Sequence, residues 1–358
     1  MNSRTINAPF RVRVVLIALT GVAALASPVI AAAQDAAATF PSRAVTMIVP
    51  FPPGGGTDTG ARWVAEQLTR KWGQPVIVDN KPGAAGKIGA EIASRAKPDG
   101  YTIMMTNAQV AAINPSLYNT MPYNAETAFT AVTLVAELPL VLLVNSELPI
   151  KTPKDFIDMA RAKPGEITYA SAGNGSSTHL AASLLEAATG IKLTHVPYKG
   201  GGPAMTDVMA GQVNSTLLTV LESGAAVKSG KVRPIAVTSI ARSPALPQLP
   251  TIAESAIPGY ASISWIGLLA PSGVPTTIIH KIAKDVGDIV NSVEMKQRFI
   301  DQGATPVGGT PAQFQALIDS EQAKYRKIIA EKNISATDYW GQTPILCSPE
   351  IRVRLQFL

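Results

Sequence analysis

PFPPGGGTD, residues 50–58, lies between an apolar run and a helical pattern. Pro52 and Pro53 end the preceding strand because proline cannot donate to a strand ladder. The three glycines that follow permit positive φ angles and let another molecule approach the main chain closely. Thr57 or Asp58 is predicted to cap the helix. The stretch therefore predicts a loop whose N–H groups form an anion site at a helix N-terminus.

The stretch lacks the sequence patterns of the common phosphate- and nucleotide-binding loops. No lysine follows the glycines, so the phosphate-binding pattern G-x-x-x-x-G-K-[ST] is absent. Thr59 stands where the pattern G-x-G-x-x-G requires a glycine, which disfavours a nucleotide. Taken alone, the three glycines are equally compatible with a tight strand-to-helix turn that binds nothing.

A second glycine loop between a strand and a helix favours a binding role. In ITYASAGNGSSTHL, residues 167–180, a strand passes through Gly173 and Gly175 into a helix that begins near Ser176. A third glycine turn, VPYKGGGPA at residues 196–204, is expected at the same end of the second sheet. Ligands of open parallel sheets bind outside the carboxyl ends of the strands. Two such loops in facing lobes predict a cleft that holds an organic acid by its carboxylate oxygens.

The whole chain alternates apolar strand patterns with helical patterns, which predicts an α/β fold of parallel sheets covered on both faces. Prolines 139, 149 and 153 bracket one strand, and a proline-rich run covers residues 243–260. We therefore expect two Rossmann-like lobes, the first discontinuous over residues 40–138 plus 260–334 and the second over residues 139–259. Two chain crossings between them would form a hinge that permits closure on a ligand.

The chain begins with Arg4, Arg11 and Arg13, an apolar run over residues 14–26, and three alanines at 31–33. This order is typical of a secretory signal peptide, predicted to be residues 1–33, and implies export. Its removal lowers the net charge from +6 to +3. With one cysteine, Cys347, no internal disulfide is possible, and the three histidines are not at metal-ligand spacing. The sequence lacks the basic clusters with interleaved aromatic residues that would indicate nucleic-acid binding. Residues 335–358 fit no preceding pattern and are interpreted as a C-terminal appendage.

Five ordered motifs carry a family resemblance: FPSRAVTMIVPFPPGGGTD (40–58), KPGAAGKIGAEIASRAKPDGYT (81–102), SAGNGSSTHL (171–180), VPYKGGGPA (196–204) and PTIAESAIPGY (250–260). They resemble the tripartite tricarboxylate transporter substrate-binding receptors, also called Bug proteins. The resemblance implies a type II periplasmic binding protein that captures a carboxylate and passes it to membrane permease subunits. The family often has acids in the strand after the third glycine turn, where this chain has Asn214 and Leu218. That departure argues against an amine-bearing ligand if position 218 faces the cleft.

The candidate ligand-binding residues come from these loops: Phe51, Pro53, Gly55, Gly56, Thr57, Asp58, Ala172, Gly175, Ser176, Ser177, Thr178, His179, Tyr198 and Lys199. Alternatives stay open for several of them. Asp58 caps main-chain N–H groups or touches ligand through water, and Lys199 meets a distal carboxylate or lies solvated at the rim. His179 is in a first helical turn, where the helix dipole disfavours an imidazolium, so a neutral packing role is favoured over proton transfer.

The predicted function is a periplasmic receptor for a small organic acid, either a di- or tricarboxylate or an aromatic carboxylate. The receptor is expected to be a monomer with no cofactor, metal or catalytic residue. One alternative is an exported serine hydrolase that uses Ser176 or Ser177, although GNGSSTH does not match G-x-S-x-G. Another is a receptor that presents its ligand to a sensor kinase, which the sequence does not distinguish from delivery to a permease.

Overall fold

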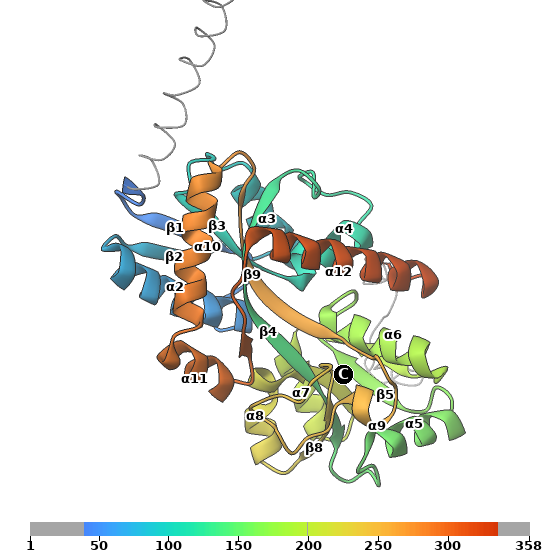
Figure 1. The fold of residues 1–358 in the computed structure, drawn as a ribbon. Coiled ribbons are helices and arrows are strands. Elements are labelled where there is room, and N and C mark those ends of the chain that lie inside the picture. Colours follow the sequence, from blue (N-terminus) through green and yellow to red (C-terminus); the bar gives the residue numbers. More distant parts are fainter. Residues whose placement is uncertain (1–38, 199, 336–358) are drawn as a thin grey trace, which may run out of the picture.

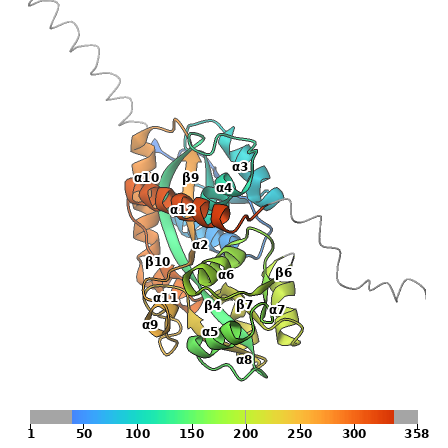
Figure 2. The ribbon, with the colours of Figure 1, turned by 90° about the vertical axis from the view of Figure 1, so that its right-hand side faces the viewer.

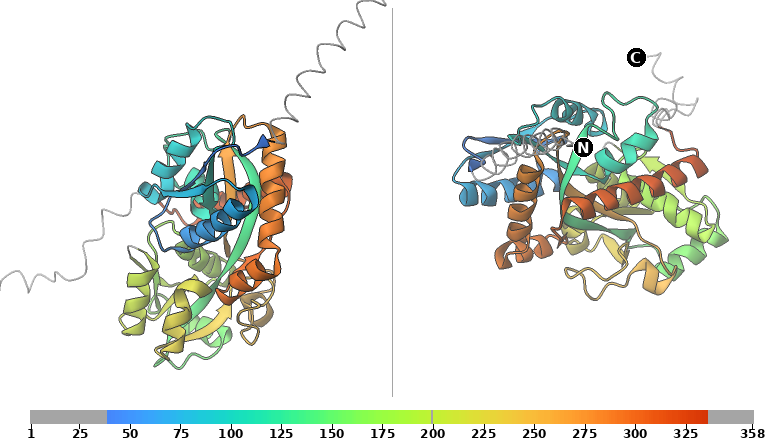
Figure 3. Two further views of the ribbon diagram at one scale, coloured as in Figure 1. Left: turned by 90° about the vertical axis from the view of Figure 1, so that its left-hand side faces the viewer. Right: turned by 45° about the horizontal axis from the view of Figure 1, so that its top comes forward.

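A computed structural model describes residues 39–198 and 200–335 (Figure 1). The predicted signal peptide, residues 336–358 of the predicted appendage, Cys347 and Lys199 lie outside the described residues. No helix of the described part is long and apolar enough to cross a membrane. Figure 3 shows one set of elements stacked above another, with the long strand β4 (Phe129–Asn145) running through both.

The first set surrounds a sheet with the strand order β2-β1-β3-β9-β4. Its strands are β1 (Val45–Val49), β2 (Val76–Asn80), β3 (Thr102–Asn107), β9 (Ile263–Pro271) and the first part of β4. The short strand β10 (Thr305–Pro306) also pairs with β4. Strands β1, β2 and β3 are mutually parallel, whereas β9 runs antiparallel to both β3 and β4.

The second set surrounds a sheet in which the remainder of β4 pairs with β7 (Ser215–Thr219), followed by β5 (Thr168–Ser171) and β6 (Thr194–Pro197). Strand β8 (Val232–Val237) pairs with β4 as well. The strand pairs β5–β6 and β5–β7 are parallel, and those of β4 are antiparallel. The prediction of parallel sheets was therefore wrong for part of the fold, because β4 runs against all its partners and β9 runs against β3.

Alternating side chains explain how helices cover both faces. In β1, Val45, Met47 and Val49 pack with α2 (Gly56–Trp72), α10 (Thr276–Val290) and α11 (Val293–Asp301), whereas Ile48 packs on the opposite face. That face carries α3 (Lys87–Ser94), the π-helix η2 (Gln109–Ile113), α4 (Asn114–Leu117) and α12 (Pro311–Glu331). The alternation is the period of two expected of a strand buried on both faces.

The second sheet is covered in the same way. Its faces pack against α5 (Pro153–Ala162), α6 (Ser177–Thr189) and α9 (Ile252–Ser255) on one side, and α7 (Gly201–Met209) and α8 (Val220–Lys228) on the other. Figure 2 shows α12 of the upper set next to α6 of the lower set, and Lys332 lies 4.0 Å from Glu186 there. The two helical layers meet beside the cleft described below.

Strand β4 changes partners between Pro139 and Leu140: Pro139 is opposite Ile263 of β9, and Leu140 is opposite Thr219 of β7. Thr238, fully buried, joins the two chain segments that cross here. The main-chain N–H of Leu140 donates to its Oγ1 at 3.0 Å, and the main-chain N–H of Ser262 donates to its carbonyl oxygen at 3.0 Å. The crossing is therefore a narrow pair of strands held by one threonine.

Candidate ligand-binding cleft

A cavity of about 820 Å³ lies between the two sets of elements. Every loop that lines it follows a strand or begins a helix: 50–57 after β1, 82–86 after β2, 107–109 after β3, 172–177 after β5 and 200–201 before α7. Tyr118 and Glu222 complete the lining. The cavity is large enough for a small organic molecule with its hydration.

The upper wall is formed by the loop 50–58. Asp58, at the end of this loop, holds it in place through hydrogen bonds on the side away from the cleft. Asp58 is buried, and its carboxylate accepts from the main-chain N–H of Gly54 at 2.9 Å, Arg62 Nε at 3.0 Å and Asn80 Nδ2 at 2.8 Å. Burial opposes its ionisation, but these hydrogen bonds outweigh burial and lower the pKa of Asp58. Asp58 therefore positions the loop from inside the lobe.

The start of α2 differs from the prediction. The N-cap residue is Gly55, which offers no side-chain acceptor, so neither Thr57 nor Asp58 caps the helix. Among the described residues, no protein acceptor is found for the main-chain N–H groups of Gly55, Gly56 and Thr57. These donors line the cleft at the positive end of a helix of 17 residues. This is the arrangement that binds a carboxylate or another small anion.

A second loop of the upper wall, residues 83–86, has an unusual backbone. Ala84 and Ala85 have φ angles of 48° and 55°, a region that costs non-glycine residues about 1–2 kcal/mol each. The buried Asn114 holds this loop, since its Nδ2 donates to the Ala85 carbonyl at 2.9 Å and its Oδ1 accepts from Gln109 Nε2 at 2.8 Å. Ala85 and Gln109 both line the cleft.

The lower wall is the loop 172–177 before α6. Here several main-chain N–H groups are already paired with protein. Ala172 donates to Thr178 Oγ1 at 2.9 Å, Gly173 to Ser171 Oγ at 3.1 Å, and Gly175 to His179 Nδ1 at 2.9 Å. Those of Asn174 and Ser177 have no protein acceptor among the described residues. The second glycine loop therefore presents fewer donors than its sequence suggests.

The buried His179 and the half-buried His195 stack behind this loop, with ring centroids 4.0 Å apart, and Tyr169 stacks on His195 at 4.8 Å. His195 Nε2 lies 2.6 Å from Ser171 Oγ. Burial, aided by the neighbouring His179, lowers the pKa of His195 to about 3. The ring is therefore neutral at neutral pH and serves as packing and a hydrogen-bond partner for the loop.

Eight of the predicted binding residues line the cleft: Phe51, Pro53, Gly55, Gly56, Thr57, Ala172, Ser176 and Ser177. Asp58, Gly175, Thr178, His179 and Tyr198 do not. Asp58, Gly175, Thr178 and His179 form hydrogen bonds within the loops instead. The Tyr198 hydroxyl donates to Asp207 at 2.6 Å. Lys199 lies outside the described residues.

Several lining residues were absent from the prediction, notably Gly83, Ala85, Asn107, Gln109 and Asn174. Those between 83 and 109 follow β2 and β3, which are parallel to β1. The rule that placed residues 50–58 at the carboxyl edge of the sheet therefore applied to them equally. Glu222 follows β7, which is parallel to β5, so the same rule applied to it as well. Tyr118 has no comparable signal, because it reaches the cleft through the packing of the turn after α4.

Of the residues considered for a hydrolase, Ser176 and His179 form hydrogen bonds within the loop itself. Ser176 is the N-cap of α6, and its Oγ donates to the Gly173 carbonyl at 2.6 Å. The ring of His179 accepts from the Gly175 main chain and does not contact a serine hydroxyl through that nitrogen. A nucleophilic serine needs a base within hydrogen-bond reach, held in turn by a third group.

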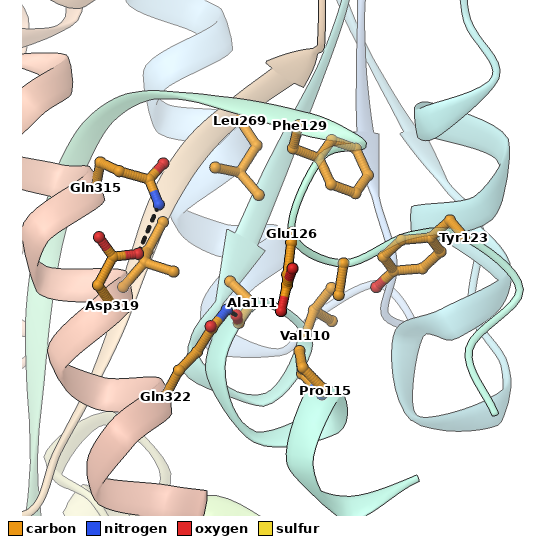
Figure 4. Close-up of a pocket in the computed structure, with 12 residues that line it drawn as sticks. Val110, Ala111, Pro115, Tyr123, Glu126, Phe129, Leu269, Gln315, Asp319 and Gln322 are labelled. Atoms are coloured by element: carbon orange, nitrogen blue, oxygen red, sulfur yellow. Dashed lines mark hydrogen bonds between the residues drawn. The ribbon is translucent and has the colours of Figure 1, made fainter. Parts of the chain in front are cut away.

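A smaller cavity of about 120 Å³ lies between α12 and the segment 110–129 (Figure 4). Its lining includes the carboxylates of Glu126 and Asp319, the latter accepting from Gln315 Nε2 at 2.8 Å. Two carboxylates disfavour an anion here. The larger cleft, with its helix N-termini, is therefore the better candidate for an acidic ligand.

Comparison with known proteins assigns this geometry to a family. The sequence profile of the tripartite tricarboxylate transporter family receptor matches residues 60–334. The chain belongs to this family. The predicted family and the two-lobed α/β fold are thereby confirmed.

Individual relatives agree with the assignment. The receptor is 36% identical over 298 residues to a UPF0065 protein encoded between tcbD and tcbE in Pseudomonas sp. strain P51, covering 83% of this chain and 88% of the relative. It is 35% identical to the protein BugT of Bordetella pertussis, covering 84% of this chain and 92% of the relative.

Solved structures include Rpa4515 of R. palustris with adipate, at 36% identity and a TM-score of 0.76, covering 83% of this chain and 99% of that one. MatC of Rhodopseudomonas palustris with bound malate is 30% identical with a TM-score of 0.71, covering 81% of this chain and 100% of that one. The receptor therefore shares its fold with proteins crystallised with carboxylates.

Proposed function

We propose that this receptor captures a small organic carboxylate in the cleft and delivers it to the membrane subunits of a tripartite tricarboxylate-type transporter. The observation that carries the proposal is that the main-chain N–H groups of Gly55, Gly56 and Thr57 have no acceptor in the described part of the chain, and that these residues line the same cleft as Ser177. The relatives with adipate and malate support this ligand class. The charge-assisted hydrogen bonds would each be worth about 1.5–3 kcal/mol.

The proposed ligand-binding residues are those predicted positions that line the cleft, together with Asn107, Gln109 and Asn174. We further propose that residues 40–138 plus 260–334 and residues 139–259 close on the ligand as two lobes. The partner change of β4 at Pro139 and Leu140 supports this division, since only two chain segments cross there. Hinge closure of this kind excludes water from the bound acid.

We also propose that residues 1–33 direct the chain to the periplasm, where it acts as a monomer without catalysis. The receptor family supports this location. The order of basic residues, an apolar run and small residues in that segment supports it as well. Delivery to a permease rather than a sensor kinase follows the family description. We expect a strain that lacks the gene for this receptor to lose uptake of the carboxylate, and not only the induction of genes in response to it.

The test of carboxylate capture removes one N–H group. Gly56 is the first residue of α2, a position where helices accept proline. The preceding Gly55 has a ψ of 168°, which suits the residue before a proline. We therefore expect Gly56→Pro to keep the helix and to remove one N–H donor. We expect di-, tri- or aromatic carboxylates to stabilise the wild type by about 2.7 kcal/mol at 100 times Kd. Calorimetry should show at least about tenfold weaker binding to Gly56→Pro.

Val293→Pro is the matched control. Val293 is also the first residue of its helix, follows an extended N-cap residue with ψ of 152°, and is 88% exposed away from the cleft. It should bind carboxylates as the wild type does. A wild type that no organic acid stabilises, or equal affinity of Gly56→Pro and Val293→Pro, would contradict the proposal.

A further inference from the structure

Glu222 carries the only charged side chain among the described residues that line the cleft. The remaining lining is main chain, apolar side chains and neutral polar side chains. We infer that Glu222 determines specificity: it disfavours a second carboxylate beside its own side chain and favours a carboxylate ligand that carries an amino or hydroxyl donor there. The inference rests on the proposed function, because it concerns a second group of the same ligand.

The first step is that Glu222 is held in place. It forms a capping box at the start of α8, in which its main-chain N–H donates to Thr219 Oγ1 at 3.3 Å. In return, its Oε2 accepts from Thr219 Oγ1 at 2.8 Å and from the Thr219 main-chain N–H at 3.3 Å. The carboxylate is thereby fixed at the cleft wall without a cationic side chain among the described residues that pairs with it.

The second step is that one oxygen of Glu222 is left for a ligand. No hydrogen bond to Oε1 is found within the described part of the chain. This oxygen faces Gly201, another lining residue, where an added Cβ would lie 3.1 Å from it. The missing side chain at Gly201 leaves the space beside Oε1 open to the cleft.

The third step concerns the neighbouring strand. Leu218 is fully buried in the hydrophobic cluster between β7 and the helices α7 and α8, and it does not line the cleft. An apolar residue at position 218 therefore says nothing about the charge of the ligand. The acid that meets the cleft stands four positions later, which reverses the sequence-based argument against an amine-bearing ligand.

The physical consequence follows from Coulomb interactions in a partly enclosed site. One carboxylate of a ligand is attracted by the helix N-termini at Gly55–Thr57 and Ser177. A second carboxylate near Glu222 would be repelled, whereas an ammonium or hydroxyl group would donate to Oε1. The cleft thus offers main-chain donors at the helix N-termini and one acidic acceptor at Glu222.

The experiment compares ligands of equal length by calorimetry: succinate with 4-aminobutanoate and 4-hydroxybutanoate, and adipate with 6-aminohexanoate and 6-hydroxyhexanoate. The variant is Glu222→Gln, because glutamine also completes a capping box and removes only the charge. The matched control is Glu254→Gln, since Glu254 forms the same capping box with Thr251 at the start of α9, away from the cleft.

We expect the wild type to prefer the amino or hydroxy acid at one of the two lengths. In Glu222→Gln, binding of the amino acid should weaken at least about tenfold, and binding of the dicarboxylate should strengthen about threefold or more. Glu254→Gln should match the wild type.

Equal affinities in Glu222→Gln and the wild type, or a wild-type preference for the dicarboxylate at both lengths, would overturn the inference while leaving carboxylate capture intact. A wild type that binds no acid of either series, nor any other organic acid, would overturn both proposals.

Discussion

At the scale of single residues, Asp58 shows how an acid can support the proposed anion site without facing it. Its carboxylate is turned away from the cleft and satisfies Gly54, Arg62 and Asn80. Burial would raise its pKa, but these hydrogen bonds lower it on balance. A carboxylate pointing at the ligand would repel it, so the geometry resolves a conflict that the residue type alone presents.

We predict that Asp58→Asn lowers the free energy of unfolding by about 1–3 kcal/mol at neutral pH, because a charge-assisted network is lost. Since the folded pKa lies below the unfolded value of about 3.9, the difference from the wild type should be full above that pH. It should shrink as the pH falls towards the folded pKa. Urea unfolding between pH 3 and pH 7 measures it, and a difference that grows on acidification would contradict the network.

His195 gives a second pH-dependent contribution. Its pKa falls to about 3 in the folded state, against about 6.5 for a free imidazole. Between these values the unfolded chain binds a proton that the folded chain does not, so stability should fall as the pH drops below about 6.5, by up to about 1.4 kcal/mol per pH unit. His195→Asn should flatten this slope in urea unfolding between pH 4 and pH 7. An unchanged slope would refute the assignment.

At the scale of secondary-structure elements, the π-helix η2 and the left-handed turn at Ala84–Ala85 depend on one another. Asn114 joins them through hydrogen bonds to the Ala85 carbonyl and the Gln109 side chain. Strained backbone of this kind persists only when its surroundings hold it. The elements are short, yet they place two lining residues on the upper wall of the cleft.

Asn114→Ala should therefore cost about 1–3 kcal/mol of unfolding free energy, since a buried carbonyl and an amide lose their partner. It should also weaken carboxylate binding, because Gln109 and Ala85 are released. Denaturant unfolding and calorimetry measure the two effects. Asn124→Ala, which removes an exposed turn acceptor for the Glu126 main chain, is the control and should change affinity little. Wild-type affinity in Asn114→Ala would show that the loop needs no such support.

At the scale of the whole molecule, the loop 172–177 of the lower wall meets the upper set of elements at Leu117. Gly175, with φ of +68°, lies against Leu117 so closely that an added Cβ would be 2.1 Å from Leu117 Cδ2. The backbone angle and the contact both require glycine. This contact between the two sets of elements depends on a residue that has no side chain.

Gly175→Ala should destabilise the protein by about 1–2 kcal/mol from backbone strain alone, with a further loss from the contact with Leu117. Adding Leu117→Ala should recover only the contact part, so that a double-mutant cycle gives a coupling energy of about 0.5–3 kcal/mol. Denaturant unfolding of the four proteins provides the values. Strict additivity would show that the two residues do not meet in solution.

The residue and element scales differ in how far the sequence predicts them. The helix patterns, the glycine loops and the change of character near residue 139 follow from local rules of proline, glycine and hydrophobic periodicity. The antiparallel crossing of β4 and β9 does not, because strand direction depends on pairing between segments more than 120 positions apart in the chain. The same limit applies to Tyr118, which reaches the cleft only through packing.

By itself, the sequence determined the family, the α/β class and the place of the glycine loops proposed to bind an anion, because each depends on residues that are neighbours in the chain. Only the tertiary structure decided which donors are left for a ligand. Thr178, His179 and Ser171 take N–H groups of the second loop, whereas those of Gly55, Gly56 and Thr57 stay without a protein acceptor among the described residues. A hydrogen-bond donor serves one acceptor well, and which acceptor lies nearest is settled by the fold.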